Sequence, residues 1–161
     1  MYRSTVAAKQ RRPQARLLRA VSAECPERTS SPERKTLVWI DDYEPGLALY
    51  KLMFENLGYR VLTASRGKAG LDLIRSNAVD AVVVDYEMPE MDGEAVASHI
   101  KQSDPTLPVV MFTASDIVPH RVRSLVDALC HKTGSCDQLT NTVQQALLNR
   151  PVPSAACAYA A

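Results

Sequence analysis

Short apolar runs alternate with amphipathic stretches from Thr36 to about residue 149. Apolar runs of strand length lie at 37–40, 60–63, 81–84, 109–112 and 128–130. The first, third and fourth runs are continuously apolar, which is typical of strands in a parallel sheet with helices on both faces. The run at 60–63 is weaker, and we expect it nearer an edge of the sheet.

Apolar residues recur with the helical period between these runs. The predicted helices lie at about 45–57, 67–76, 94–103, 118–125 and 139–147. Pro45 and Pro119 stand near the starts of two of them, Gly58 follows one, and Pro151 limits the last. This alternation of strand and helix predicts one doubly wound α/β domain over residues 36–149.

The two flanking segments differ in composition from the domain. Residues 1–35 contain three prolines and no sustained periodicity, so we expect a mostly disordered extension, and 150–161 a short C-terminal tail. Residues 1–35 carry nine Lys or Arg and three Glu, a net charge of +6, whereas 36–161 carry ten and fifteen acids, net −5. The basic extension could be a solvated tail, an organellar transit peptide, or a segment that binds an anionic surface or nucleic acid.

Composition excludes several classes of protein. Of the 161 residues, 46% are hydrophobic and 23% charged, which suffices for a folded core. No apolar run approaches the roughly 18 residues that a membrane span needs. The four cysteines are scattered without a CxxC pair, and we find no signal peptide, so we expect reduced thiols in the cytoplasm and no zinc site.

Polar residues stand where the predicted strands end. Asp41 and Asp42 follow the first strand, Asp85 the third and Thr113 the fourth, while the fifth strand runs into Lys132. Ligands of doubly wound folds bind outside the carboxyl ends of the strands, so we expect these side chains to share one rim. Polar residues are also common wherever loops begin, but five at the ends of four strands favour a site.

Three carboxylates at one rim repel one another unless a cation joins them. Oxygen ligands without His or Cys suit a hard divalent cation, and Mg²⁺ is the usual choice for phosphate chemistry. Lys132 and Thr113 could then hold the oxygens of a phosphoryl group. The sequence therefore predicts a magnesium site next to a phosphoryl site.

The segment 85–93, Asp-Tyr-Glu-Met-Pro-Glu-Met-Asp-Gly, is the second signal. Together with 38–42, 112–114 and 131–132, it makes residues 36–149 resemble the receiver domain of two-component response regulators. The resemblance implies a flavodoxin-like (βα)5 fold with strand order 2-1-3-4-5. It also implies a phosphorylatable switch, not an enzyme in the ordinary sense, whose acyl phosphate hydrolyses slowly.

The resemblance assigns a role to each rim residue. Asp85 matches the residue that accepts a phosphoryl group from a phosphohistidine. Asp42 and Asp85 would bind Mg²⁺ directly, with the backbone carbonyl of Glu87 as a third ligand, and Asp41 mainly through water. Thr113 would hydrogen-bond the phosphoryl group and Lys132 would pair with it. Glu87 and Ser115 would flank the water that hydrolyses the acyl phosphate.

The sequence departs from the family pattern at three places. Leu129 replaces the aromatic residue usual on the fifth strand, and Thr133 replaces the proline usual after the lysine. A cis Lys132–Thr133 bond would cost about 2.5–4 kcal/mol. The segment from Thr113 to Lys132 is a few residues shorter than usual, so we expect the fourth helix to lose about a turn.

Three functions are compatible with these features. The first is a stand-alone receiver that takes its phosphoryl group from a histidine kinase or histidine phosphotransfer protein and signals to a downstream protein, without a DNA-binding domain. The second is a non-phosphorylated interaction module on a receiver scaffold. The third, a Mg²⁺-dependent phosphatase of the haloacid dehalogenase type, usually has a second Asp where Glu87 stands.

Overall fold

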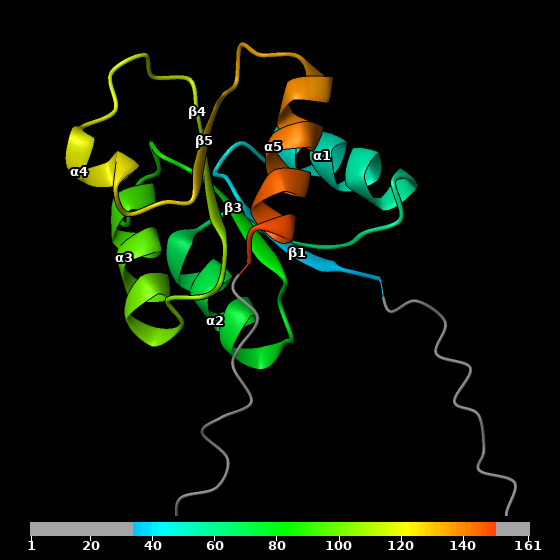
Figure 1. Cartoon of the computed structure of the whole chain (residues 1–161), viewed down its shortest axis with the longest axis horizontal. Helices are drawn as coiled ribbons and strands as arrows, with labels where there is room; N and C mark the ends of the chain where they lie inside the picture. The colour runs from blue at the N-terminus through cyan, green and yellow to red at the C-terminus, as the bar shows by residue number, and fades with distance from the viewer. Residues whose placement is uncertain (1–33, 151–161) are drawn as a thin grey trace, which may run out of the picture. The chain divides into compact units, whose positions relative to one another are not determined.

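The computed structural model describes residues 34–150, in which strands and helices alternate (Figure 1). The strands are β1 (Thr36–Ile40), β2 (Arg60–Ala64), β3 (Ala81–Asp85), β4 (Val109–Thr113) and β5 (Ala128–His131). The helices are α1 (Glu44–Asn56), α2 (Gly67–Ser76), α3 (Gly93–Ser103), α4 (His120–Arg123) and α5 (Cys136–Leu148). The expectations for 1–33 and 151–161 lie outside the described residues.

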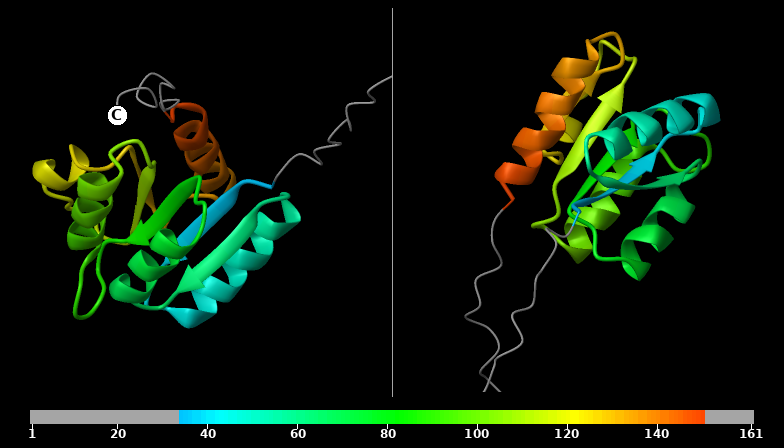
Figure 2. Two further views of the ribbon diagram at one scale, coloured as in Figure 1. Left: turned by 90° about the horizontal axis from the view of Figure 1, so that it is seen from below. Right: turned by 90° about the vertical axis from the view of Figure 1, so that its right-hand side faces the viewer.

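The five strands form one parallel sheet in the order β2-β1-β3-β4-β5, which confirms the predicted topology (Figure 2). Every residue of β1, β3 and β4 is buried, as their continuous apolar sequences predict. β2 and β5 are the edge strands and are partly exposed. The expected edge position of the second strand is therefore confirmed.

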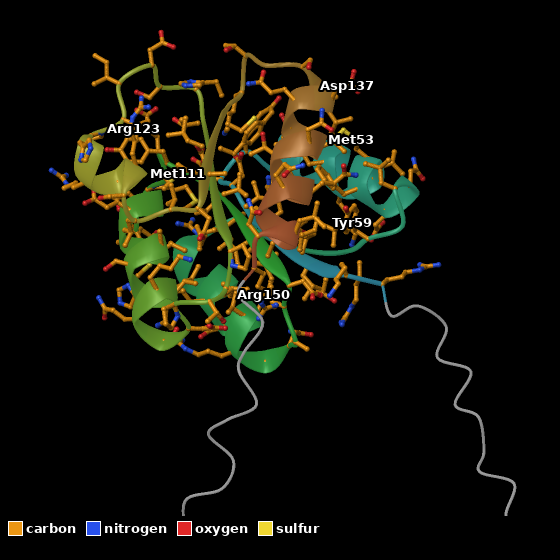
Figure 3. The ribbon with its side chains drawn as sticks, in the orientation of Figure 1. Met53, Tyr59, Met111, Arg123, Asp137 and Arg150 are labelled. Atoms are coloured by element: carbon orange, nitrogen blue, oxygen red, sulfur yellow. The ribbon has the colours of Figure 1, made fainter. Side chains whose placement is uncertain are left out.

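Helices cover both faces of the sheet. α1 and α5 pack on one face, around Trp39 and Phe54, and α2, α3 and α4 pack on the other, around Ile40 and Ile100 (Figure 1). Of the residues labelled in Figure 3, Asp137 lies in the first turn of α5 and Arg150 lies just beyond its end. Trp39 is fully buried, which confirms its expected place in the core.

Two of the helices begin at hydrogen-bonded caps. The Asp92 side chain accepts from the Ala95 amide at 2.8 Å, and the Ser135 hydroxyl accepts from the Gln138 amide at 3.1 Å. Both caps stand where the chain leaves the carboxyl end of the sheet. They therefore help to fix the loops that carry the predicted rim residues.

The fourth helix is short, as the length of the segment from Thr113 to Lys132 predicts: only His120–Arg123 is helical, whereas the apolar pattern extends over 118–125. Val122 is buried in the turn, but the chain must then reach the start of β5, where the Asp127 carboxylate accepts from the Val109 amide. The Arg121 guanidinium ties the turn to α3 through two bonds to Glu94, of 2.6 and 3.0 Å. No helix in 34–150 has the length and apolar character that a membrane crossing requires.

Candidate phosphoryl site

The rim at the carboxyl ends of β1, β3, β4 and β5 carries the predicted side chains. Asp85 and Thr113 are the last residues of their strands, Asp41 and Asp42 follow β1, and Lys132 follows β5. β1, β3, β4 and β5 are consecutive neighbours in the sheet, so these residues from distant parts of the sequence meet. The parallel register thus assembles the site.

The three carboxylates form a tight group. Asp41, Asp42 and Asp85 each offer an oxygen within 4.8 Å of the others. Asp41 and Asp85 are buried, whereas Asp42 is exposed. The group is therefore open to solvent on the side of Asp42.

Lys132 enters this group from β5. Its ammonium lies 2.7 Å from an Asp41 carboxylate oxygen and 2.9 Å from one of Asp85. The pairing with Asp41 was not predicted, since we expected Lys132 to pair with a phosphoryl group. One ammonium does not balance three carboxylates, so the donor set has the charge and the oxygen chemistry that fit a divalent cation such as Mg²⁺.

Burial shifts the pKa values of Asp85 and Lys132 in opposite directions. Burial raises the pKa of the Asp85 carboxyl, and the hydrogen bond and charge of Lys132 oppose that rise without cancelling it. Burial on its own lowers the pKa of Lys132, but its hydrogen bonds to Asp41 and Asp85 outweigh this effect and raise it. Lys132 is thus held as an ammonium, while the charged form of Asp85 is disfavoured.

The ionisation of Asp85 makes the free energy of unfolding depend on pH. Its folded pKa lies above the ordinary value of 3.8, so the folded state loses stability as pH rises through that pKa. Asp85→Asn is therefore expected to raise the free energy of unfolding of the metal-free protein, with a gain that grows as pH rises from about 4 through the raised pKa. Urea denaturation in EDTA, followed by Trp39 fluorescence, measures it.

Asp80→Asn is the matched control with the opposite sign. Burial raises the pKa of Asp80, but hydrogen bonds from Lys35 and the Thr36 amide outweigh this and lower it. The control should be less stable than wild type at neutral pH, and this deficit should shrink as pH falls through the lowered pKa, because wild type then loses the stability that ionised Asp80 contributes. A gain for Asp85→Asn that shrinks as pH rises would contradict the assignment.

Thr113 is fully buried at the end of β4. Its hydroxyl accepts from the Ser115 amide at 2.9 Å, and its carbonyl accepts from the Lys132 amide at 2.7 Å. Within 34–150, no hydrogen bond joins the Thr113 side chain to Asp85. The structure therefore places Thr113 at the rim but leaves its hydroxyl bonded to its own loop.

The loop after β3 requires Gly93. The Gly93 amide donates to the Tyr86 carbonyl at 2.9 Å, and a Cβ at this position would lie 2.2 Å from the backbone oxygen of Asp85. Glu87, two residues beyond Asp85, is exposed, and its backbone hydrogen bond is one of the influences that lower the pKa of Asp85. The clash of a Cβ at position 93 would be with the backbone of Asp85, so it cannot be relieved by rotation of a side chain.

Gly93→Ala is accordingly expected to lower the free energy of unfolding by roughly 1–3 kcal/mol. Urea denaturation measures the loss, and Gln102→Ala, on an exposed position of the same helix, is the control. Equal midpoints for the two variants would show that the loop can move away from the added methyl group.

The Lys132–Thr133 peptide bond is trans, as are all the peptide bonds of the described segment. The sequence argument against a cis bond before Thr133 is therefore confirmed. Sequence reasoning missed Phe112, whose ring centre lies 5.7 Å from the Lys132 ammonium. Phe112 directly precedes Thr113 at the end of a strand, which could have indicated a place near the site. It is also part of the continuous apolar run 109–112, and we therefore assigned it only to the core.

Comparison with known proteins agrees with this geometry. Residues 37–144 match the family model described as "Response regulator receiver domain". The chain is 37% identical over 99 residues to response regulator MprA of Mycolicibacterium vanbaalenii, covering 60% of this chain and 42% of MprA. It is 34% identical over 107 residues to sensor histidine kinase RcsC of Salmonella typhi, covering 65% of this chain and 11% of RcsC.

Solved structures show the same fold. Response regulator TrrA from Thermotoga maritima, in complex with Mg²⁺-BeF, is 26% identical with a TM-score of 0.66, covering 70% of this chain and 98% of that one. The receiver domain of Francisella response regulator 1452 is 26% identical with a TM-score of 0.65, covering 71% and 98%. The family match spans nearly all of the described α/β domain, so the chain belongs to the receiver domain family of two-component response regulators.

Proposed function

We propose that this receiver accepts a phosphoryl group on Asp85 from the phosphohistidine of a histidine kinase or a histidine phosphotransfer protein. The observation that carries the proposal is the group of Asp41, Asp42 and Asp85 with the Lys132 ammonium 2.9 Å from the Asp85 carboxylate. Such a constellation combines a nucleophile, oxygen ligands for a cation and a fixed positive charge. These are the parts that phosphoryl transfer to a carboxylate needs.

The proposed step is an in-line displacement at phosphorus. A carboxylate oxygen of Asp85 forms the new O–P bond while the P–N bond to the donor histidine breaks. The electron pair of that bond returns to the imidazole nitrogen, and the product is an acyl phosphate on Asp85. The acyl phosphate is hydrolysable, which suits a signal of limited duration.

Each rim residue has a part in this step. Asp42, Asp85 and the Glu87 carbonyl would hold Mg²⁺, with Asp41 acting through water, and the ion would supply positive charge against the phosphoryl oxygens. Lys132 exchanges its carboxylate partners for a phosphoryl oxygen. Thr113 donates its hydroxyl proton to another phosphoryl oxygen, while Glu87 and Ser115 flank the path of the hydrolytic water.

The proposed role is that of a switch and not of a turnover enzyme. Movement of Thr113 and Lys132 towards the new dianion changes the β4–α4 and β5–α5 loops, because Thr113 directly precedes the first loop and Lys132 begins the second. We place the signal in contacts with a downstream protein in the cytoplasm. The free thiols of Cys130 and Cys136 agree with a reducing compartment.

Intact mass after incubation with acetyl phosphate, a small phosphodonor, tests the proposal. The chain should gain one phosphoryl group in the presence of Mg²⁺ and none when EDTA removes the metal. Trp39 fluorescence, from the single tryptophan, reports metal binding in the same samples. If Mg²⁺ binds but neither acetyl phosphate nor phosphohistidine proteins yield an adduct, the chain is a non-phosphorylated interaction module.

A further inference from the structure

In the proposed reaction the Lys132 ammonium loses its two carboxylate partners to the divalent cation. Its ion pairs within 34–150 are to Asp41 and Asp85, and these are carboxylates that would turn to the divalent cation. A metal ion placed there also repels the ammonium. Some other group must keep Lys132 beside the site for its part in holding the phosphoryl group.

The Phe112 ring lies in the right place for that role. Its centre is 5.7 Å from the Lys132 ammonium, within the roughly 6 Å over which a cation is attracted to an aromatic face. Phe112 is buried on β4, and its register partner on β3 is Asp85. Unlike the carboxylates, the ring does not bind a divalent cation, so its attraction for the ammonium remains when the carboxylates are occupied.

Two further aromatic rings fix Phe112 in place. Tyr50 of α1 meets Phe112 edge-on at 5.2 Å and 89°, and Trp39 of β1 meets it at 5.7 Å and 82°. Tyr50 and Trp39 are themselves stacked at 4.7 Å and 11°. We call Trp39, Tyr50 and Phe112 the aromatic wall. Its rings hold one another, since stacked and edge-to-face pairs at these separations attract.

The aromatic wall lies on a different face of the sheet from Leu129. Trp39 and Phe112 belong to the core under α1 and α5, with Tyr50 packed against them, whereas Leu129 packs against the core under α2, α3 and α4. The pKa of Tyr50 is raised chiefly by burial, and the charges of Lys132 and Asp41 also act on it. This chain therefore has aromatic contact with its rim lysine on the face opposite to Leu129.

We infer that Phe112, held by Tyr50 and Trp39, is a positioning residue that keeps the Lys132 ammonium at the rim for the phosphoryl group. The inference rests on the proposed function. The role we assign to Phe112 is exerted only through Lys132, and not through contact with the metal or the phosphoryl group. Its loss should weaken binding of a phosphoryl group while binding of Mg²⁺ alone is unchanged.

Titrations of Phe112→Leu with Mg²⁺ alone, and with fluoroberyllate in saturating Mg²⁺, test this split. Fluoroberyllate mimics the phosphoryl group, and Trp39 fluorescence reports both titrations. The dissociation constant for fluoroberyllate should rise about three- to tenfold, and that for Mg²⁺ should stay within about twofold of wild type. Phe112→Tyr, which keeps the ring, should restore wild-type binding of fluoroberyllate.

Phe54→Leu is the matched control. Phe54 is buried in the same core and its ring lies 5.3 Å from Trp39, but its contacts do not include Lys132. Equal effects of Phe54→Leu and Phe112→Leu, or equal weakening of Mg²⁺ and fluoroberyllate by Phe112→Leu, would overturn the inference. If Phe112→Leu does not fold, Tyr50→Leu, which frees the ring, should give a smaller change of the same kind, and unchanged fluoroberyllate affinity would overturn it.

Binding measurements on the wild-type chain distinguish a failure of this inference from a failure of the proposed function. Wild type that binds Mg²⁺ but neither fluoroberyllate nor a phosphoryl group would contradict the proposed function, and the inference with it. Wild type that binds fluoroberyllate, with Phe112→Leu binding it equally well, would contradict only the role of the aromatic wall.

Discussion

Asp85→Asn is expected to abolish phosphoryl uptake from acetyl phosphate and from a phosphohistidine protein. The amide keeps the size of the side chain but lacks the anionic oxygen that attacks phosphorus. Asp41 and Asp42 remain in this variant, and Asp41 also lies beside Lys132. Both follow β1, however, so neither stands at the end of β3 next to the loop fixed by Gly93. Intact mass over time should show no adduct under conditions that fully modify wild type.

Asp80→Asn controls for the loss of an acidic side chain that makes hydrogen bonds. Asp80 lies before β3, at the opposite end of the sheet, and accepts from Lys35 and the Thr36 amide at 2.8 Å. This control should take up a phosphoryl group as wild type does, provided that the assay is run below its unfolding temperature. An adduct on Asp85→Asn at the wild-type rate would remove Asp85 from the role of acceptor.

Lys132→Met should slow phosphoryl uptake roughly 100- to 1000-fold, the usual cost of removing one preorganised group that stabilises transition-state charge. The Met side chain keeps most of the apolar stem of the lysine, so the substitution removes chiefly the charge. Binding of Mg²⁺ should not weaken, because the ammonium no longer competes for Asp41 and Asp85. Phosphorylation rates measure the slower phosphoryl uptake, and metal titrations measure the affinity for Mg²⁺.

Lys101→Met provides the comparison for this variant. Lys101 is also a largely buried lysine with a carboxylate partner, 2.6 Å from Asp127, but it lies at the end of α3 away from the rim. Its loss should reduce stability without slowing phosphoryl uptake in the folded protein. Equal rates for Lys132→Met and wild type would contradict the assigned role of Lys132.

The fold could be predicted from the sequence because its strongest signals are local. The continuous apolar runs at 81–84 and 109–112 read directly as strands buried on both faces, and the structure has β3 and β4 there. The shortness of the fourth helix was predicted from the length of the segment from Thr113 to Lys132, but its bounds were not. Val118 and Val122 share an apolar face, but the start of β5 at Ala128 limits the helix to His120–Arg123, and this is a tertiary constraint.

The site could be predicted as a set of residues but not as a set of contacts. Asp41, Asp85 and Lys132 were expected at one rim because strand ends in a parallel sheet meet there. That Lys132 bridges the two carboxylates, and that Phe112 lies beside it, depends on the register of β3, β4 and β5 and on side-chain packing. A pattern of residue types does not encode such distances.

The identity of the modified residue tests phosphoryl acceptance on Asp85 most directly. Borohydride reduces an aspartyl phosphate to homoserine, which tandem mass spectrometry locates in the peptide that carries residues 81–93. After treatment with a phosphodonor and Mg²⁺, homoserine should appear at position 85 and should be absent when EDTA is present. Homoserine at Asp41 or Asp42, or none in a chain that has gained the mass of a phosphoryl group, would contradict the proposed function.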